Sequence, residues 1–311
     1  MFNIVEKRRW YFLFSAILIA LSIAVMVVSV GQFGQPMRIG IDFTGGSIFV
    51  LKFDQVVGED DLRTVFADYG IEGAIVQPLG APEEHTWQVR TREVTANEVG
   101  SLLTALEEQI GRIDRDALTF DTVEPTVGGE VTRAAGLAIL VAALVIVVFM
   151  WFSFRRVPNA FRYGVCTIVG MLHNLLIAFG FYALMGVLAG WEVDALFLTA
   201  ILTVIGFSVQ DVIVVFDRIR ENIPRHKTES YEMVVNRSIL ETIHRSLATQ
   251  LNAMFVMVAI ILFGGETIKP FIATMLVGMV SETYSAIFIA VPLLVAWEKA
   301  STRRALARAR A

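Results

Sequence analysis

The chain has 311 residues, 55% of them hydrophobic, and a mean hydropathy of +0.63. These values exclude an ordinary water-soluble domain and predict a membrane protein with several spans. The formal net charge of −4 is unevenly distributed, because residues 36–130 contain 18 acidic and 7 basic side chains, a net −11 that leaves +7 elsewhere. We therefore expect one acidic soluble block among membrane spans with basic flanks.

The first apolar run, residues 10–30, follows the charged segment Glu6-Lys7-Arg8-Arg9. A cleaved signal peptide is disfavoured because the run is long and Val30-Gly31-Gln32 offers no small-x-small cleavage site. Residues 1–35 are therefore predicted to form a retained transmembrane helix with a cytoplasmic N-terminus.

The segment from Gly40 to Ser47 contains the glycine pair Gly45-Gly46, which permits positive φ and a close backbone approach. A phosphate-binding loop is disfavoured because no Gly-Lys-Ser/Thr follows. We expect a structural turn that leads into a strand.

Residues 36–130 alternate between strand and helix patterns. We predict strands at 47–53, 73–79, 86–94 and 118–123, and helices at 59–69 and 95–110. The second helix begins with the capping-box pattern Thr95-Ala96-Asn97-Glu98. The order βαββαβ predicts a small α+β, ferredoxin-like domain, and no catalytic constellation stands out in it.

Five more apolar runs follow at 134–154, 163–190, 193–216, 246–263 and 270–297, and 231–243 reads as an interfacial helix. Basic residues flank alternate ends of these runs, so the positive-inside rule places both termini in the cytoplasm and residues 36–130 outside. The predicted fold is a polytopic α-helical membrane protein with six transmembrane helices and one extracytoplasmic domain. Residues 131–300 form a five-helix bundle, and 301–311 form a basic cytoplasmic tail that anchors topology rather than binding nucleic acid.

The fourth span carries a carboxylate, Asp211, inside the apolar run. A charge there costs roughly 2.5–3.5 kcal/mol on insertion scales, so a function that offsets the cost is expected. Ser208, Val215 and Arg218 share a helical face with Asp211, whereas Asp217 points elsewhere.

The fifth span has a polar stripe of Glu241, Arg245, Thr249 and Asn252 at i+4, i+4 and i+3 spacing. The stripe favours a bundle-facing Arg245 that pairs with Asp211, although Arg245 is also placed as a cytoplasmic flank. His173, near the middle of the third span, and Glu282, about twelve residues into the sixth, are further candidates for proton transfer.

Three motifs resemble those of the SecD/SecF family, within the resistance-nodulation-division superfamily. They are the segment from Gly40 to Gly46, the run 206–222 of the fourth span, and residues 283–290 of the sixth. The resemblance implies a role in late protein export driven by the proton motive force, in the bacterial cytoplasmic membrane. It also implies a SecD-like partner subunit, the SecYEG channel, YajC, membrane lipid and an unfolded preprotein as partners, with a proton or sodium ion for coupling and no cofactor or metal.

By this resemblance, Asp211 corresponds to the family's essential transmembrane acid, Arg245 to its essential arginine, and Asp42 to the aspartate of the first motif. The chain departs from the family where His173-Asn174 replaces His-Asp and Glu282 replaces glycine. We hypothesise that Glu282 partly replaces the missing carboxylate in the proton path.

Two other functions remain open. The first is that the chain forms half of a small-molecule or lipid exporter of the same superfamily. Six spans with a domain of about 90 residues favour an obligate partner subunit instead. An intramembrane protease is disfavoured, because the spans show neither a Ser/His pair at helical spacing nor a His-Glu-x-x-His motif.

Overall fold

The structure is a computed structural model that describes residues 3–71, 74–79, 84–155 and 159–310. The chain divides into two compact units. One contains Ile39–Gly136, and the other contains the residues up to Arg38 together with those from Leu137 onward.

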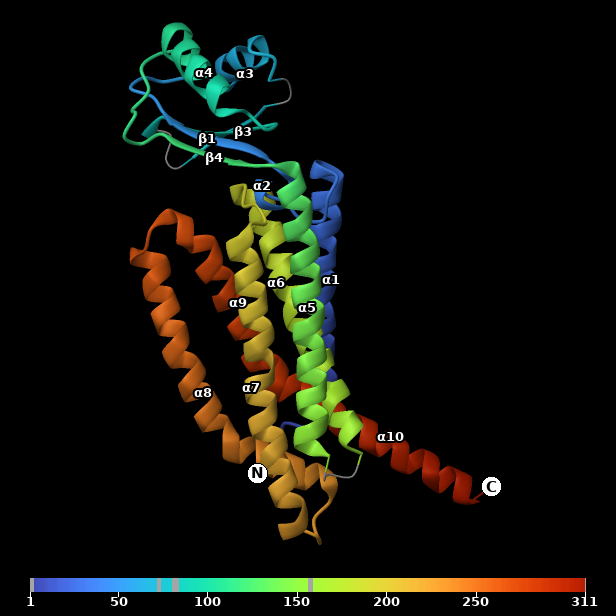
Figure 1. The fold of residues 1–311 in the computed structure, drawn as a ribbon. Coiled ribbons are helices and arrows are strands. Elements are labelled where there is room, and N and C mark those ends of the chain that lie inside the picture. The colour runs from blue at the N-terminus through green and yellow to red at the C-terminus, as the bar shows by residue number, and fades with distance from the viewer. Residues whose placement is uncertain (1–2, 72–73, 80–83, 156–158, 311) are drawn as a thin grey trace. The chain divides into compact units, whose positions relative to one another are not determined.

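The smaller unit is an antiparallel sheet with two helices (Figure 1). Its elements are β1 (Gly46–Lys52), α3 (Glu59–Asp68), β2 (Ile75–Pro78), β3 (Thr86–Thr91), α4 (Ala96–Gln109) and β4 (Thr119–Val123). The strand order β2-β3-β1-β4, with every neighbouring pair antiparallel, confirms the predicted ferredoxin-like βαββαβ arrangement. The predicted strand at 73–79 begins on Gly73, which lies outside the described residues.

Local chemistry in this unit explains both its sheet and its second helix. Alternate residues of β1, Phe49 and Leu51, are fully buried in one core with Leu106 of α4. At the start of α4 the Thr95 amide donates to Glu98 Oε2 at 2.8 Å, half of the predicted capping box. This backbone hydrogen bond is the main reason that the pKa of Glu98 lies below its usual value.

The glycine pair forms the turn that leads into β1. It follows the short helix α2 (Ile41–Thr44), which contains the half-buried Asp42. Gly45 and Gly46 have φ of 74° and 119°. A Cβ on Gly45 would lie 2.5 Å from Pro125 Cα, and one on Gly46 would lie 2.6 Å from the Thr91 carbonyl oxygen. Both sites therefore require glycine.

Gly45→Ala is expected to destabilise the protein by about 2 kcal/mol or more, because Gly45 combines φ 74° with ψ 173° and has no room for a methyl group. Gly100→Ala is the matched control, since Gly100 is inside α4 with nothing within 4 Å of its Cβ position. Thermal unfolding of the full chain in detergent should show a lower midpoint for Gly45→Ala alone. Equal midpoints for the two variants would contradict the packing argument.

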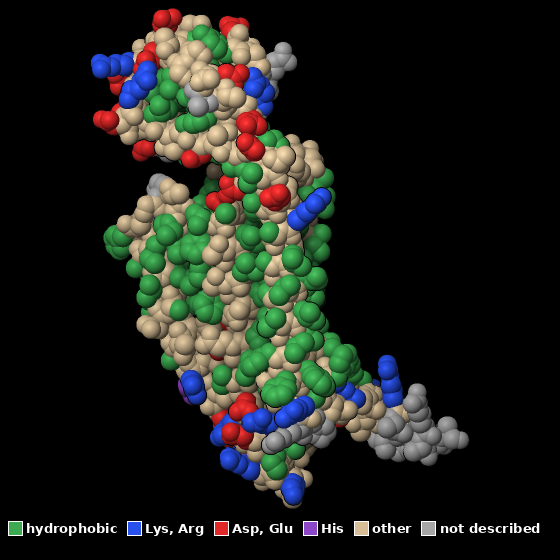
Figure 2. Space-filling model, in the orientation of Figure 1, with side chains coloured by type: hydrophobic (Ala, Val, Ile, Leu, Met, Phe, Trp, Pro, Cys, Tyr) green, Lys and Arg blue, Asp and Glu red, His purple; other side chains and the backbone are tan. Residues whose placement is uncertain are grey.

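The larger unit is a bundle of long apolar helices. They are α1 (Arg8–Phe33), α5 (Pro125–Phe154, which begins in the smaller unit), α6 (Ala160–Ala189), α7 (Ala195–Arg225), α8 (Tyr231–Phe263) and a last span from Lys269 to Arg304. Among the described residues, these six are long and apolar enough to cross a membrane, as the sequence predicted. Figure 2 shows hydrophobic side chains over the long helices and Lys and Arg side chains gathered at the end from which α10 extends.

The last span is interrupted at its middle. It consists of α9 (Lys269–Ser285), a π-helical segment (Ala286–Ala290) and α10 (Val291–Arg310). Pro292 is the second residue of α10, and because it has no backbone N–H it cannot make the regular helical hydrogen bond to the Phe288 carbonyl. The break lies within the predicted sixth-span motif.

Small residues bring the central helices close together. A Cβ on Gly278 of α9 would collide with the Val204 side chain of α7, and one on Gly180 of α6 would lie 2.6 Å from Ser22 Cα of α1. Helices that pack in a membrane use small residues in this way because lipid gives them little hydrophobic drive to associate.

Helix α8 is less enclosed than α6, α7 and the last span. It joins the predicted interfacial helix and the fifth span into one helix of 33 residues. In the 18-residue apolar stretch of α8, 17% of the residues are buried, against 50% in the corresponding stretches of α6 and α7. Leu251, Phe255 and Phe263 are exposed on it.

Candidate functional site

Asp211 lies in the middle of α7 on the face that packs into the bundle. Its side chain is 3% exposed, and Ser208 and Val215 on the same face are 1% and 2% exposed. The helical spacing that predicted a shared face for these residues is therefore confirmed as far as Val215. Burial of an acid at this depth requires partners from neighbouring helices.

The partner of Asp211 is an amide that also reaches a second acid. Gln250 of α8 is 3% exposed and donates from Nε2 to Asp211 Oδ2 at 3.2 Å and to Glu282 Oε2 of α9 at 2.6 Å. Glu282 is fully buried, and its Oε1 has no hydrogen-bond partner in the described structure. Three helices thus converge on two carboxylates and one amide.

The structure does not bring Arg245 to Asp211. Arg245 is exposed, as are Thr249 and Asn252 of the same predicted stripe, so the expected Asp211–Arg245 pair is not formed. The buried polar stripe of α8 is a different one, with i+4 spacing throughout: Ser238, Thr242, Ser246 and Gln250. The regular spacing of these four residues could have indicated that Gln250 faces the bundle. The sequence analysis instead favoured the other stripe because it contains charged residues.

His173 lies in a neighbouring polar cluster. The Ser281 hydroxyl donates to Asn174 Oδ1 at 2.8 Å, and Asn174 Nδ2 donates to the Ser208 hydroxyl at 3.0 Å. His173 Nδ1 is 3.2 Å from Asn174 Oδ1 and 3.4 Å from Ser281 Oγ, and its Nε2 has no partner in the described structure. This cluster adjoins the acid pair along the chain, because Ser281 precedes Glu282 and Ser208 is one turn before Asp211.

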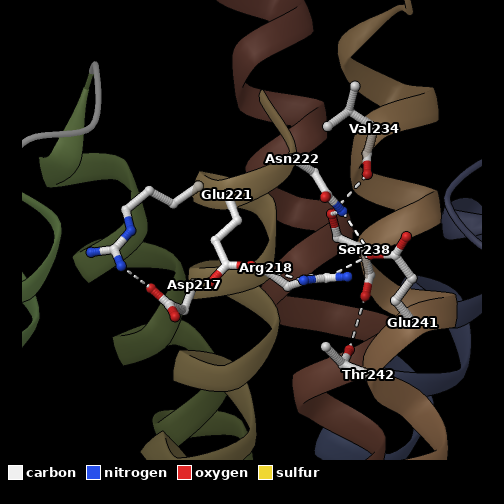
Figure 3. A network of polar contacts seen from close by, with 9 residues as sticks. Asp217, Arg218, Glu221, Asn222, Val234, Ser238, Glu241 and Thr242 are labelled. Atoms are coloured by element: carbon white, nitrogen blue, oxygen red, sulfur yellow. Dashed lines mark hydrogen bonds and ion pairs between the residues drawn. The ribbon is translucent and has the colours of Figure 1, made fainter. Parts of the chain in front are cut away.

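Asp217 and Arg218 belong to a separate network at the end of α7 (Figure 3). Arg218 Nε donates to Glu241 Oε2 at 2.6 Å, and Asp217 pairs with Arg220 at 2.5 Å. The amide of Asn222 also donates to Glu241 Oε2, at 2.8 Å. Arg218 is seven residues from Asp211, about 10 Å along the helix, so this network fastens α7 to α8 without entering the acid site.

The chemistry available at the acid site is proton exchange. Each carboxylate can take up or release a proton, and the amide can donate to either one. Among the described residues, no group of three His, Cys, Asp or Glu side chains is placed to hold a metal ion.

Comparison with known proteins identifies two matching family models. "Protein export membrane protein SecD/SecF, C-terminal" matches residues 103–300, and "SecD/SecF GG Motif" matches residues 30–55, which include Gly45 and Gly46.

Similar proteins carry the same family name. Proteins called "Protein translocase subunit SecF" from Thermobaculum terrenum and Anaerolinea thermophila are each 41% identical, over 96% and 97% of this chain and 94% and 96% of their own lengths. The crystal structure of SecDF, a translocon-associated membrane protein from Thermus thermophilus, matches with a TM-score of 0.79 and 28% identity. That match covers 96% of this chain and 39% of the SecDF chain. The relatives are named as translocase subunits rather than enzymes, and this chain belongs to the SecD/SecF family as one of its SecF members.

Proposed function

We propose that this protein uses the proton motive force to promote the late stage of preprotein translocation across the bacterial cytoplasmic membrane. The observation that carries the proposal is the buried pair of carboxylates, Asp211 and Glu282, bridged by Gln250. The names of its relatives support the translocation role.

The acid pair suits a proton carrier because no Lys or Arg among the described residues is buried beside it. Two ionised carboxylates sharing one neutral amide repel each other, and burial removes the water that would screen them. A single proton on Asp211 or Glu282 removes the repulsion and leaves one buried charge in place of two. The pair is therefore stable when it holds a proton and strained when it holds none, which gives two states that a proton can switch.

The driving force is large enough for this switch. One charge moved through 100 mV corresponds to about 2.3 kcal/mol, which biases a two-state equilibrium roughly fifty-fold. One or two protons per cycle would suffice to drive repacking of α7, α8 and α9 around the site.

The proposed orientation places both termini in the cytoplasm and residues 36–130 outside. This orientation is supported by the Lys and Arg side chains gathered at the end of the bundle where α7 ends and from which α10 extends (Figures 1 and 2). Basic residues are enriched on the cytoplasmic side of membrane proteins. Protons would then reach Asp211 from the outer side of the membrane.

The proposed assembly includes a SecD-like subunit. The chain covers 39% of the SecDF chain that it resembles, and a SecD-like part would account for the remainder. A SecYEG channel would supply the preprotein in transit.

Export into inverted vesicles containing the complex tests this function. Preprotein export is expected to rise when a proton gradient is imposed and to fall to the unstimulated level when a protonophore collapses it. A sodium gradient without a proton gradient is the control arm. Stimulation by sodium alone would reject the proton as the coupling ion, and no stimulation by either gradient would reject the proposed function.

A further inference from the structure

We propose that a groove between α5 and α6, near the basic end of the bundle, binds one acyl chain of an anionic phospholipid whose phosphate is held by Arg155. Neither Asp211 nor Glu282 lines this groove, so the inference goes beyond the proposed proton coupling and does not depend on it. It assigns a lipid of stated charge to a defined place on the bundle.

The groove is formed where the last turns of α5 pass the first turns of α6. It has a volume of about 220 Å³ and is lined by apolar side chains that include Val147 and Trp151 of α5 and Phe161 and Ile168 of α6. Gly164 of α6 also lines it, and nothing lies within 4 Å of its Cβ position. Sites for compact, drug-sized ligands measure about 300–1,000 Å³. The groove therefore suits a slender hydrocarbon chain better than a bulky ligand.

The groove lies on a side of α5 that the bundle leaves open. In the 18-residue apolar stretch of α5, 11% of the residues are buried, the smallest share among the six described spans. Met150 and Phe154, both buried, pack α5 against Tyr163 of α6 and Phe216 of α7. Trp151 lies about 100° around the helix from Met150, so it faces away from that packing. Figure 2 shows hydrophobic side chains along α5 as far as the end where Lys and Arg side chains gather.

The rims of the groove favour an acyl chain over a second transmembrane helix. Helices that associate in membranes approach each other through small residues. Here the side chains of Trp151 and Phe161, one from each helix, are 60% and 71% exposed and would hold a helix away from Gly164. A single hydrocarbon chain can pass between the two rings. Tryptophan is enriched at the membrane–water interface, which places this end of the groove near the lipid headgroups.

Arg155 supplies the charge complementarity. It is exposed and follows Trp151 by four residues, so it lies on the same face of α5 one turn nearer to the membrane surface. Its guanidinium carbon is 4.3 Å from the centroid of the Phe152 ring, and among the described residues it forms no ion pair. Arg162, by contrast, is paired with Glu298. A guanidinium presents paired N–H donors that match a phosphate, so Arg155 is free to bind the headgroup of a lipid whose chain fills the groove.

The test identifies the lipid beside Trp151. The full chain, in the complex with its SecD-like partner, is reconstituted into phosphatidylcholine vesicles that contain a low mole fraction of phosphatidylglycerol. Either the phosphatidylglycerol or an equal mole fraction of the phosphatidylcholine carries bromine on its acyl chains, which quenches the fluorescence of a neighbouring tryptophan. The quenching of Trp151 is obtained as the difference between the native chain and Trp151→Phe.

Brominated phosphatidylglycerol should quench Trp151 roughly fivefold more than brominated phosphatidylcholine, because one Arg near the membrane surface attracts an anionic lipid by about that factor. Arg155→Gln, at an exposed position, should lower this ratio to about one, and Gly164→Leu should do the same by filling the groove. Arg133→Gln and Gly136→Leu make the same changes at exposed positions near the other end of α5 and should leave the ratio unchanged.

Three results would overturn the inference. The first is equal quenching by the two lipids in the native chain, and the second is an unchanged ratio in Arg155→Gln or in Gly164→Leu. The third is protection of Trp151 from both brominated lipids, which would show that the partner subunit covers the groove.

Discussion

Asp211→Asn is expected to remove gradient-stimulated export while leaving the chain folded and inserted. Asparagine nearly matches aspartate in size, and its Oδ1 can still accept the hydrogen bond from Gln250, so the packing of α7 against α8 is retained. What is lost is a group that binds and releases a proton. Since a full charge through 100 mV biases the equilibrium roughly fifty-fold, the stimulated rate should fall to the rate without a gradient.

Asp217→Asn is the matched control for this experiment. It makes the same chemical change on the same helix, but Asp217 is half-exposed and paired with Arg220 outside the acid site. Export in inverted vesicles, with and without a gradient, separates the two variants. Normal gradient stimulation in Asp211→Asn, or equal losses in both variants, would reject Asp211 as the coupling acid.

Hydrophobic patterning predicted much of the fold because membrane spans and alternating strands leave strong periodic signals. Six spans and the ferredoxin-like order followed from run lengths and turn residues. The placement of Asp211 on a buried face followed from helical spacing to Ser208 and Val215. Each of these depends on local sequence, which is why each could be predicted.

The buried face of α8 could not be predicted in the same way. The helix carries two polar stripes, one through Arg245 and one through Gln250, and both fit helical spacing. Which stripe faces inward depends on how α8 rotates against α7 and α9, and that is a tertiary property. The direct link between Asp211 and Glu282 was missed for the same reason, since it depends on an amide from a third helix.

The π-helical segment was missed for a different reason. The sequence analysis expected an uninterrupted run at 270–297 and drew nothing from Pro292, and a proline alone does not specify how the backbone accommodates it. The structure places the distortion directly after α9, within one turn of Glu282 and Ser285. The wider helical turn therefore lies beside the acid site.

Glu282→Gln is expected to weaken export at shallow gradients while leaving part of it at steep ones. Glutamine keeps the size of Glu282 but cannot hold a proton, and it removes the like charge that faces Asp211 across Gln250. Asp211 alone would then need a higher proton concentration on the outer side. Removing one like-charge contact should move the outer pH for half-maximal export to a lower value.

Titrating outer pH in export assays measures this shift, and the comparison of three variants identifies its cause. Glu282→Asp keeps a carboxylate on a shorter side chain and should stay closer to the native profile than Glu282→Gln. Glu130→Gln, at an exposed position on α5, should leave the profile unchanged. If Glu282→Gln exports normally at every applied pH gradient, the second acid takes no part in coupling. Asp211 would then be the one switching group of the pair, and the missing partner of Glu282 Oε1 would be a feature of packing alone.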